Sequence, residues 1–368
     1  MKNKVLSIFS VVAATFFTVH RLQVDSLNAQ SATPPSAIMV SEYVFERAPF
    51  ASAHASTIQQ TREGLAVAWY GGTREGAPDV GIWLSRHTKD GWTRPVEVAN
   101  GTESASRRYA CWNPVLFEMP DGVITLFYKI GPSPSSWWGV VRTSRDGGQT
   151  WSNARRLPDG ILGPAKNKPV RLPDGSVLSP ASTESSDAPS TWRIHFERTI
   201  NRGETWTVVN VPTTGQEIHP IQPSILIYPD GKLQAIGRSR SRRIYETWSN
   251  DLGRTWTPPA LTSLPNPNSG TDATTLRDGR QLLVYNHSGQ GRSPLNVALS
   301  RDGRNWEAAL VLENEPGEYS YPAVIQTTDG LVHITYTWRR QRIKHVTIDP
   351  ARLVSVPIRD LSWPAEIR

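Results

Sequence analysis

The sequence SRDGGQTW at residues 144–151 decides the fold of this chain of 368 residues, because it is one copy of a repeat. Further copies begin roughly every 50 residues, and the last copy is one residue shorter: TINRGETW at 199–206, SNDLGRTW at 249–256 and SRDGRNW at 300–306. A repeat period of this length indicates a fold built from similar units that pack against one another.

Each copy predicts a tight turn that carries an anchor. Its Asp or Asn side chain is short enough to accept hydrogen bonds from backbone N–H groups inside the turn, and its Gly adopts a positive φ without a Cβ clash. The Trp that ends each copy then presents a large apolar surface for burial against a neighbouring unit. We therefore interpret the repeat as a folding device and not as a catalytic motif.

A second series of turns raises the number of units to six. Each turn is a Gly preceded by an acidic residue, between two runs rich in apolar and β-branched residues, as in Val115–Met119 and Val123–Tyr128. A Gly-containing turn between two such runs predicts a β-hairpin. The six turns are Glu63-Gly64, Asp121-Gly122, Asp174-Gly175, Asp230-Gly231, Asp278-Gly279 and Asp329-Gly330.

Together the two series predict an all-β fold, a six-bladed β-propeller of four-stranded antiparallel sheets. The first unit carries only a degenerate copy of the repeat, Ser85–Trp92, and the last unit, from Tyr319, has room for three strands. We expect the apolar segment Ala37–Phe45 to supply the missing strand and close the ring. A single long open sheet is the alternative, but it would leave exposed edges.

The first 29 residues have the pattern of a secretory signal peptide. Lys2 and Lys4 precede a mostly apolar stretch, Val5–Val19, that is too short to span a bilayer, and Ala29 offers a small residue for cleavage. We expect residues 30–36 to be a flexible leader, residues 37–368 to form the propeller, and the mature chain to have no membrane span. The expected location is periplasmic or secreted, in a bacterium, with a retained N-terminal anchor as the alternative.

The composition of the chain limits its possible disulfides, ligands and metal sites. Cys111 is the only cysteine, so no intrachain disulfide forms and apolar burial must hold the domain together. A net charge of +7 suits an anionic ligand, and no nucleic-acid-binding motif is visible. The eight histidines are scattered without carboxylate partners at metal-ligand spacing, so we expect no metal and no cofactor. We expect a monomer.

Polar residues recur where the first strand of each unit begins. Because each of these strands ends at its turn, its start lies at the opposite face, where a propeller brings six strands together at the central axis. The residues at the six starts are His54, Asn113, Lys168, Gln222, Asp272 and Tyr321. The second strands and the loops of the same mouth add Arg74, Asp79, Trp138, Arg238, His287, Arg292 and Arg340.

This arginine-rich mouth predicts a binding site for an acidic glycan or oligosaccharide. Arginine forks bind carboxylates bidentately, and aromatic faces receive sugar rings. Structural roles are the alternative for several members. Asn113 and Gln222 would then satisfy backbone groups at strand ends, Trp138 would pack between blades, and His54 would be a buried histidine with its hydrogen bonds made.

The repeats resemble the Asp-box repeats of the sialidase (neuraminidase) superfamily, and six units match its six-bladed propeller. Within that superfamily the chain is most similar to the bacterial sialidase-like proteins with BNR repeats. The segments that carry this similarity are AHAST at 53–57, GGTREG at 71–76, RSPLN at 292–296 and GEYSYP at 317–322.

The resemblance implies an exo-α-sialidase-like glycoside hydrolase that releases a terminal acidic sugar. Sialidases hold the substrate carboxylate with three arginines, two of which Arg238 and Arg292 resemble. Tyr319 resembles the tyrosine nucleophile, with Tyr321 as a competitor, and Asp79 resembles the acid/base aspartate. A neutral tyrosine activated by a base suits an anionic sugar, because a charged nucleophile would be repelled.

The sequence departs from the family at two positions. Ala53-His54-Ala55 stands where an Arg-Ile-Pro motif opens the first blade, so the third arginine is missing unless Arg74 replaces it. Gln222 stands where the glutamate is expected, with Glu217 nearby but out of register. A second hypothesis is therefore a polysaccharide lyase or another hydrolase acting on uronate-containing glycans, with His54 or Tyr321 as base. A non-catalytic glycan-binding propeller is the third.

Overall fold

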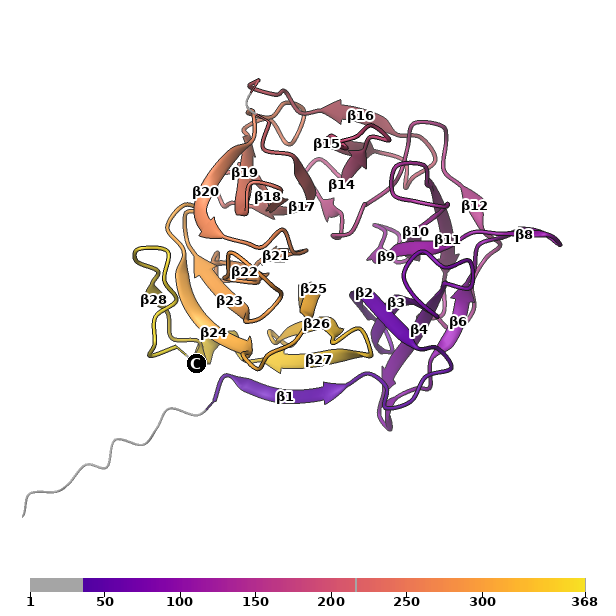
Figure 1. Cartoon of the computed structure of the whole chain (residues 1–368), viewed down its shortest axis with the longest axis horizontal. Helices are drawn as coiled ribbons and strands as arrows, with labels where there is room; N and C mark the ends of the chain where they lie inside the picture. Colours follow the sequence, from indigo (N-terminus) through magenta and orange to yellow (C-terminus); the bar gives the residue numbers. More distant parts are fainter. Residues whose placement is uncertain (1–35, 216, 368) are drawn as a thin grey trace, which may run out of the picture. The chain divides into compact units, whose positions relative to one another are not determined.

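A computed structural model describes residues 36–215 and 217–367, and these residues form a six-bladed β-propeller. Figure 1 shows the sheets arranged in a circle, with strands β2, β9, β17, β21 and β25 nearest its centre. The predicted all-β propeller of six blades is thus confirmed. The predicted signal peptide and nearly all of the predicted leader lie outside the described residues.

Blades 1 to 3 follow one another along the chain, and each has four antiparallel strands in sequence order from the axis outward. Blade 1 gains a fifth strand, β6, beside β4, and a small hairpin, β7–β8, lies between blades 1 and 2. The strands are β2 (Ser52–Thr61), β3 (Gly64–Gly72), β4 (Gly81–Thr88), β5 (Gly91–Trp92), β6 (Val96–Ala99), β7 (Thr102–Ser104), β8 (Arg107–Arg108), β9 (Cys111–Glu118), β10 (Ile124–Ile130), β11 (Trp138–Ser144), β12 (Arg155–Arg156), β13 (Val170–Arg171), β14 (Val177–Glu184), β15 (Trp192–Thr199) and β16 (Thr207–Asn210).

Blades 4 to 6 repeat this arrangement, and blade 5 gains a short outer strand, β28, that pairs with β24. One turn of 3-10 helix, η1 (Pro350–Arg352), follows the last blade. The strands are β17 (Pro220–Ile227), β18 (Leu233–Ser239), β19 (Arg243–Ser249), β20 (Ala260–Pro265), β21 (Asp272–Thr275), β22 (Gln281–Tyr285), β23 (Leu295–Ser300), β24 (Glu307–Glu313), β25 (Tyr319–Gln326), β26 (Val332–Trp338), β27 (Arg342–Ile348) and β28 (Val356–Pro357).

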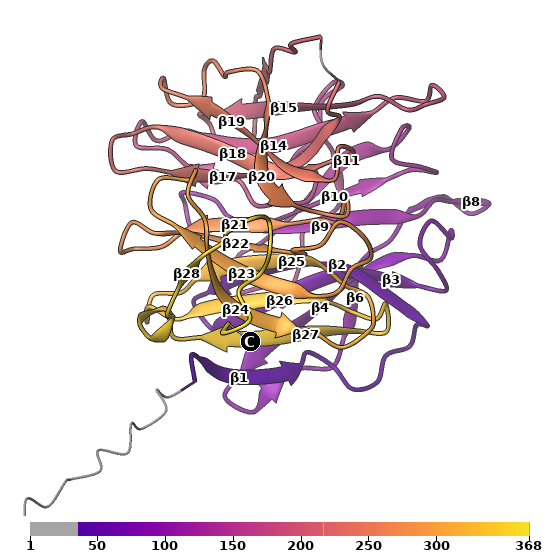
Figure 2. The ribbon, with the colours of Figure 1, turned by 60° about the vertical axis from the view of Figure 1, so that its left-hand side comes forward.

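The N-terminal strand β1 (Ile38–Tyr43) closes the ring. It pairs antiparallel with β27, from Ile38 opposite Ile348 to Tyr43 opposite Lys344, and so becomes the outer strand of blade 6. Figures 1 and 2 both show β1 alongside β27. The prediction that Ala37–Phe45 supplies the missing strand is confirmed, and the last blade is left with no unpaired β27 edge.

The Asp-box turns are held by side chains of the box itself. The Ser144 hydroxyl accepts from the Gly148 N–H at 2.9 Å and donates to Asp146 at 2.8 Å. The hydroxyl and the N–H of Thr150 both donate to the Asp146 carboxylate, and they lower its pKa to about 2. The Trp151 indole N–H donates to the Gly148 carbonyl at 3.2 Å. The boxes at 199, 249 and 300 repeat the main bonds.

Each box tryptophan packs against the preceding blade, as the repeat predicts. Trp256 of blade 4 stacks on Phe196 of β15, with ring centroids 4.1 Å apart and an interplanar angle of 15°. Gly253, at φ +76°, lets the turn approach blade 3, since a Cβ there would lie 2.5 Å from the Leu178 side chain. The boxes therefore join neighbouring blades as well as neighbouring strands.

Trp256→Ala should lower the free energy of unfolding by about 3–5 kcal/mol, because it removes the stacked ring and leaves a cavity between two blades. Urea unfolding followed by circular dichroism would measure the loss. Trp138→Ala is the matched control. Trp138 is only partly buried, so its replacement should lower the free energy of unfolding clearly less. Equal losses for the two variants would contradict a special role for the box tryptophan.

A histidine cluster lies behind the closing strand. The rings of His333 and His345 stack 5.2 Å apart, with Nδ1 of His333 2.9 Å from Nε2 of His345. His345 Nδ1 lies 3.0 Å from the Glu42 carboxylate of β1. Burial, and then the charge of His345, lower the pKa of His333 to about 4, although Asp329 opposes the shift. The folded chain thus keeps His333 neutral at a pH where an unfolded histidine binds a proton.

His333 should make stability depend on pH. Histidine in an unfolded chain titrates near pH 6.5, so between about pH 6.5 and pH 4 the unfolded state binds more protons and the fold loses stability as pH falls. His333 alone would lower the free energy of unfolding by about 3 kcal/mol between pH 6.5 and pH 4. The difference between wild type and His333→Gln, measured by urea unfolding at several pH values, isolates it. Parallel pH profiles for the two proteins would contradict the prediction.

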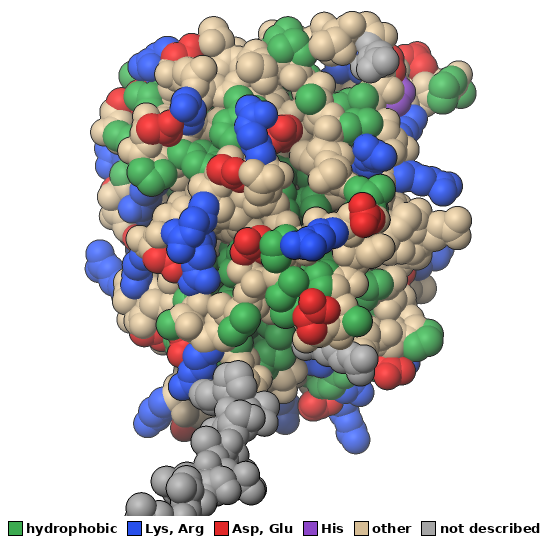
Figure 3. Space-filling model, turned by 90° about the vertical axis from the view of Figure 1, so that its left-hand side faces the viewer, with side chains coloured by type: hydrophobic (Ala, Val, Ile, Leu, Met, Phe, Trp, Pro, Cys, Tyr) green, Lys and Arg blue, Asp and Glu red, His purple; other side chains and the backbone are tan. Residues whose placement is uncertain are grey.

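The surface charge of the propeller is mixed. On the face drawn in Figure 3, lysine and arginine side chains alternate with aspartate and glutamate side chains. The positive net charge of the chain is therefore not gathered into one patch on that face. The described part of the chain contains no helix with the length and apolar character needed to span a bilayer.

Candidate active site at the axial mouth

Four inner strands begin with the same β-bulge. Ala55, Asn113, Gln222 and Tyr321 have positive φ angles of 57°, 38°, 54° and 51°, each where the pairing with the second strand shifts register. Non-glycine residues adopt this conformation only when their surroundings impose it, and a bulge re-aims the side chain. Ala55, and not His54, is therefore the structural equivalent of the other three, which corrects the predicted ring by one residue.

Tyr321 is the centre of a cationic cluster. Its hydroxyl accepts a hydrogen bond of 2.8 Å from Arg238. The guanidinium carbons of Arg238 and Arg292 lie 5.4 and 5.7 Å from its ring centroid, and the Lys166 ammonium lies 5.8 Å away. The His54 ring is 4.2 Å from the same ring. The structure thus brings together four predicted residues, Tyr321, Arg238, Arg292 and His54, and adds Lys166.

Arg238 is buried and its guanidinium is fixed from several sides. It is only 7% exposed, and its Nε donates to the Gln222 amide oxygen at 3.2 Å. A further N–H donates to the Asn268 carbonyl at 2.9 Å, and the Trp192 ring lies 5.4 Å from the guanidinium carbon. Such a fixed donor presents its remaining N–H groups in one direction. Gln222 therefore serves here as an acceptor for an arginine.

A third guanidinium comes from Arg340, in the loop between β26 and β27. Its Nε and the Nη1 of Arg292 both donate to the same oxygen of Glu318, each at 2.7 Å. The other end of Arg340 pairs with Glu75 of blade 1. Burial raises the pKa of Glu318, but Arg292 and Arg340 lower it further, so the carboxyl is ionised. Glu318 shows that a carboxylate oxygen fits between these two arginines.

His54 lies under this cluster as a neutral imidazole. It is 1% exposed, its Nδ1 lies 2.9 Å from the Thr337 hydroxyl, and its Nε2 has no hydrogen-bond partner among the described residues. Burial, and then the charges of Arg340 and Arg292, hold the pKa of His54 well below its usual value. A neutral ring nitrogen is thus available beside Tyr321 at neutral pH.

Two lysines cross the axis from blade 3. The Lys166 ammonium donates to the carbonyls of Thr271 and Pro322, and burial lowers its pKa to about 7. Lys168 pairs with the buried carboxylate of Asp272 at 2.9 Å. Asp272 also accepts from Ser224 and Val324, which lie further along their strands than the cluster does. Lys168 and Asp272 therefore tie blades together below the cluster.

Tyr319 lies apart from the cluster. It is 1% exposed and packs in the core between blades 5 and 6, where its hydroxyl accepts from Arg339 at 3.2 Å. Tyr321 belongs to a different core cluster, because the bulge at Tyr321 turns its side chain away from that of Tyr319. The structure places Tyr321, and not Tyr319, beside Arg238 and Arg292.

Three other predicted residues stand on the surface of the mouth. The Arg74 side chain is exposed and makes no hydrogen bond or ion pair with any described residue. The hydroxyl of Thr73 donates to the Asp79 carboxylate at 2.5 Å, and this bond lowers the pKa of Asp79. Glu217 forms a bidentate pair with Arg193, at 2.6 and 2.8 Å. None of the three contacts Tyr321.

Asn113, Trp138 and His287 make structural contacts. The Asn113 amide donates to the Ala165 carbonyl of the next blade at 2.9 Å. Trp138 meets Tyr109 edge-to-face at 5.5 Å. His287 bonds the Tyr285 hydroxyl and the Leu361 carbonyl, and so holds the C-terminal segment. These contacts favour the structural alternative for Asn113 and Trp138.

Sequence reasoning missed Lys166 and Glu318 and assigned no role to Arg340 or Glu184. Lys166 and Glu318 lie two and three residues from Lys168 and Tyr321, but neither falls at the predicted strand start. Arg340 was only one of several mouth arginines. Glu184, at the end of β14, interacts with Arg238 and Trp192, and burial raises its pKa. No group of three metal-ligating side chains with the geometry to hold an ion occurs within residues 36–215 and 217–367.

Comparisons with known proteins define the family. The sequence profile of the BNR repeat-like domain matches residues 63–334. This chain belongs to the BNR repeat-like family. The predicted resemblance to proteins with BNR repeats is thus confirmed. No significant match occurs among curated proteins.

Several solved structures share the fold. A protein of unknown function from Dyadobacter fermentans is 16% identical, with a TM-score of 0.69 over 84% of this chain and 98% of that chain. The NanB sialidase of Streptococcus pneumoniae is 10% identical, with a TM-score of 0.67 over 87% of this chain and 71% of that chain. The intramolecular trans-sialidase of Ruminococcus gnavus is 13% identical, with a TM-score of 0.66 over 86% of this chain and 99% of that chain. Identities this low establish the fold alone.

Proposed function

We propose that this protein is a sialidase-like glycoside hydrolase that removes a terminal acidic sugar from a glycan. The observation that carries the proposal is that Arg238 and Arg292 lie at the Tyr321 ring, while Arg340 shares the Glu318 carboxylate with Arg292. Three guanidinium groups give bidentate recognition of a sugar carboxylate. Arg340 would take the part of the arginine that is absent from the first blade, because the Arg74 side chain is exposed and bonds to no described residue. The NanB sialidase and the trans-sialidase share the fold and add support.

Tyr321 is the proposed nucleophile. Its oxygen attacks the anomeric carbon as the glycosidic C–O bond breaks, its proton passes to a base, and the leaving oxygen takes a proton from an acid. The neutral imidazole of His54 is the proposed base, since Gln222 has no basic group. Glu184 is the proposed acid, because its pKa is raised whereas that of Asp79 is lowered. Water then hydrolyses the glycosyl–tyrosine bond.

A second candidate function is β-elimination at a uronic acid. Two features favour elimination. A neutral His54 lies beside Tyr321, and position 222 holds a glutamine where sialidases would have a glutamate. His54 Nε2 would take the proton at C5, which the arginines acidify by neutralising the carboxylate, and Tyr321 would protonate the oxygen that leaves C4. The product carries a C4=C5 double bond conjugated with the carboxylate, whereas a hydrolase adds water.

Release of sialic acid from a fluorogenic α-sialoside tests the main proposal. Arg238→Ala should lower kcat/KM at least about 100-fold, as the loss of a buried charged donor does, while Arg74→Ala should keep activity. Tyr321→Phe should lower kcat about 1000-fold or more, while Tyr319→Phe should not. Each pair matches a residue in the cluster with one of the same type outside it.

The outcome of this assay separates the candidates. A folded wild type that releases no sialic acid, but converts a uronate polymer into a product with the absorbance of a conjugated acid, would replace hydrolysis by elimination. Activity that survives Tyr321→Phe but not Tyr319→Phe would contradict the assignment of the nucleophile in either reaction.

A further inference from the structure

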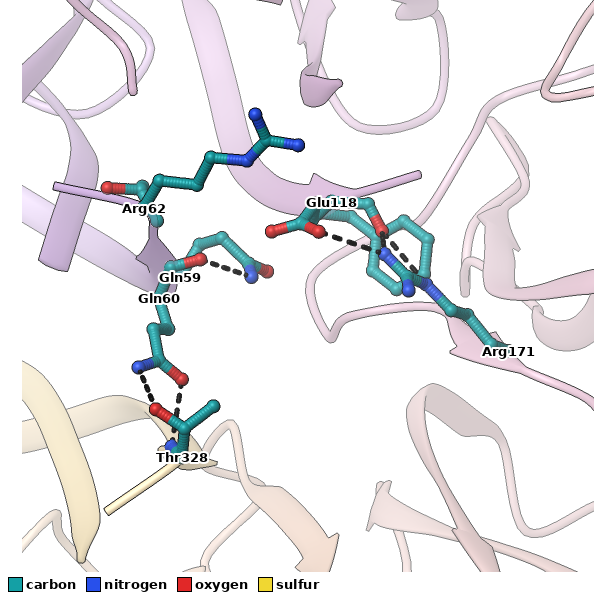
Figure 4. Close-up of a pocket in the computed structure, with 8 residues that line it drawn as sticks. Gln59, Gln60, Arg62, Glu118, Arg171 and Thr328 are labelled. Atoms are coloured by element: carbon teal, nitrogen blue, oxygen red, sulfur yellow. Dashed lines mark hydrogen bonds and ion pairs between the residues drawn. The ribbon is translucent and has the colours of Figure 1, made fainter. Parts of the chain in front are cut away.

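A polar cavity opens at the end of the inner strands opposite to the mouth, on the face that carries the Asp-Gly turns (Figure 4). Its volume is about 570 Å³, within the usual range for small-molecule sites. Six residues of β2 separate His54 from Gln60, which at ~3.3 Å per residue places the cavity roughly 20 Å from the arginine cluster. The cavity is lined by Gln59, Gln60, Thr61, Arg62, Phe117, Glu118, Arg171 and Thr328.

The walls of this cavity are fixed across two blade junctions. Between blades 6 and 1, the Gln60 amide donates to the Thr328 hydroxyl at 2.8 Å and accepts from the Thr328 N–H at 2.9 Å. Between blades 2 and 3, Arg171 donates to the backbone carbonyls of Glu118 and Met119. Figure 4 shows both pairs on opposite sides of the opening. A site whose walls are already bonded loses little entropy when a ligand binds.

Arg62 is the free charged group of this cavity. Its guanidinium lies against the blade 2 turn, where a Cβ on Gly122 would be 3.2 Å from its Nη2. It makes no hydrogen bond or ion pair with any other residue of the described part of the chain. The amide of Gln59 donates to the Gln60 carbonyl at 2.8 Å, which leaves the Gln59 side-chain oxygen free to accept. The cavity thus combines an unpaired cation with a neutral acceptor.

The charge of the lining selects the ligand class. Two arginines face one glutamate, and Glu118 is already 3.4 Å from Arg171, so one net positive charge remains at Arg62. A polyanion such as phosphate would meet the Glu118 carboxylate, whereas a group with one carboxylate and several hydroxyls matches both the cation and the acceptors. This is the chemistry of a single acidic sugar unit.

We propose that the turn face carries a second, non-catalytic glycan site, in which Arg62 binds the carboxylate of one acidic sugar and Gln59 and Glu118 accept from its hydroxyls. The site would hold a chain of acidic sugars while the arginine cluster acts on another end. Binding at this site does not depend on the reaction proposed for Tyr321.

Calorimetric titration of the full chain with a tetrasaccharide of galacturonic acid tests the proposal. Arg62→Ala should weaken binding at one site about tenfold or more, which corresponds to ~1.4 kcal/mol, and Arg62→Lys should retain part of the affinity. The Arg62 side chain is exposed and bonds to no described residue, so its removal should leave the fold unchanged, and circular dichroism checks this. The same tetrasaccharide with its carboxylates reduced to alcohols should not bind there.

The variant Arg238→Ala distinguishes binding at the axial mouth from binding at the turn face. It should remove binding at the axial mouth and leave the Arg62-dependent site intact, so failure of the proposed function would leave this inference standing. Binding that is unchanged in Arg62→Ala, equal binding of the reduced tetrasaccharide, or complete loss of binding in Arg238→Ala alone would each overturn the second site. Absence of any binding to the wild type would overturn its ligand class.

Discussion

The pairing of β1 with β27 is the constraint on which the rest of the structure depends. It joins the first described strand to the last blade in one sheet, so blade 6 contains strands from both ends of the propeller. Arg340 of blade 6 reaches Glu75 of blade 1 only across this junction, and His54 reaches Thr337 across it as well. Ring closure therefore assembles the mouth, and not merely the scaffold.

The mouth holds several cations close together without destabilising the fold. Three kinds of partner offset their mutual repulsion: the Glu318 carboxylate between Arg292 and Arg340, the aromatic ring of Tyr321, and the backbone carbonyls that accept from Lys166. Glu318 keeps its charge because of its arginines, whereas His54 and Lys166 are driven towards their neutral forms by burial. One small region thus contains fixed charges and neutral bases side by side.

The fold was predictable from the sequence because its determinants are local. A box such as residues 249–256 contains the donors, the acceptor, the glycine and the tryptophan of its own turn. The site was less predictable, since a one-residue bulge exchanges His54 for Ala55 in the ring and separates Tyr321 from Tyr319. Arg340 could not be distinguished from the other mouth arginines, because its position depends on contacts with a blade at the other end of the chain.

The most direct test of the account is a crystal structure of the protein soaked with N-acetylneuraminic acid. We expect one sugar at the axial mouth, with its carboxylate within hydrogen-bond distance of Arg238, Arg292 and Arg340 and its anomeric carbon facing the Tyr321 hydroxyl. A sugar bound with its carboxylate away from these arginines, or a mouth that stays empty at saturating ligand, would contradict it.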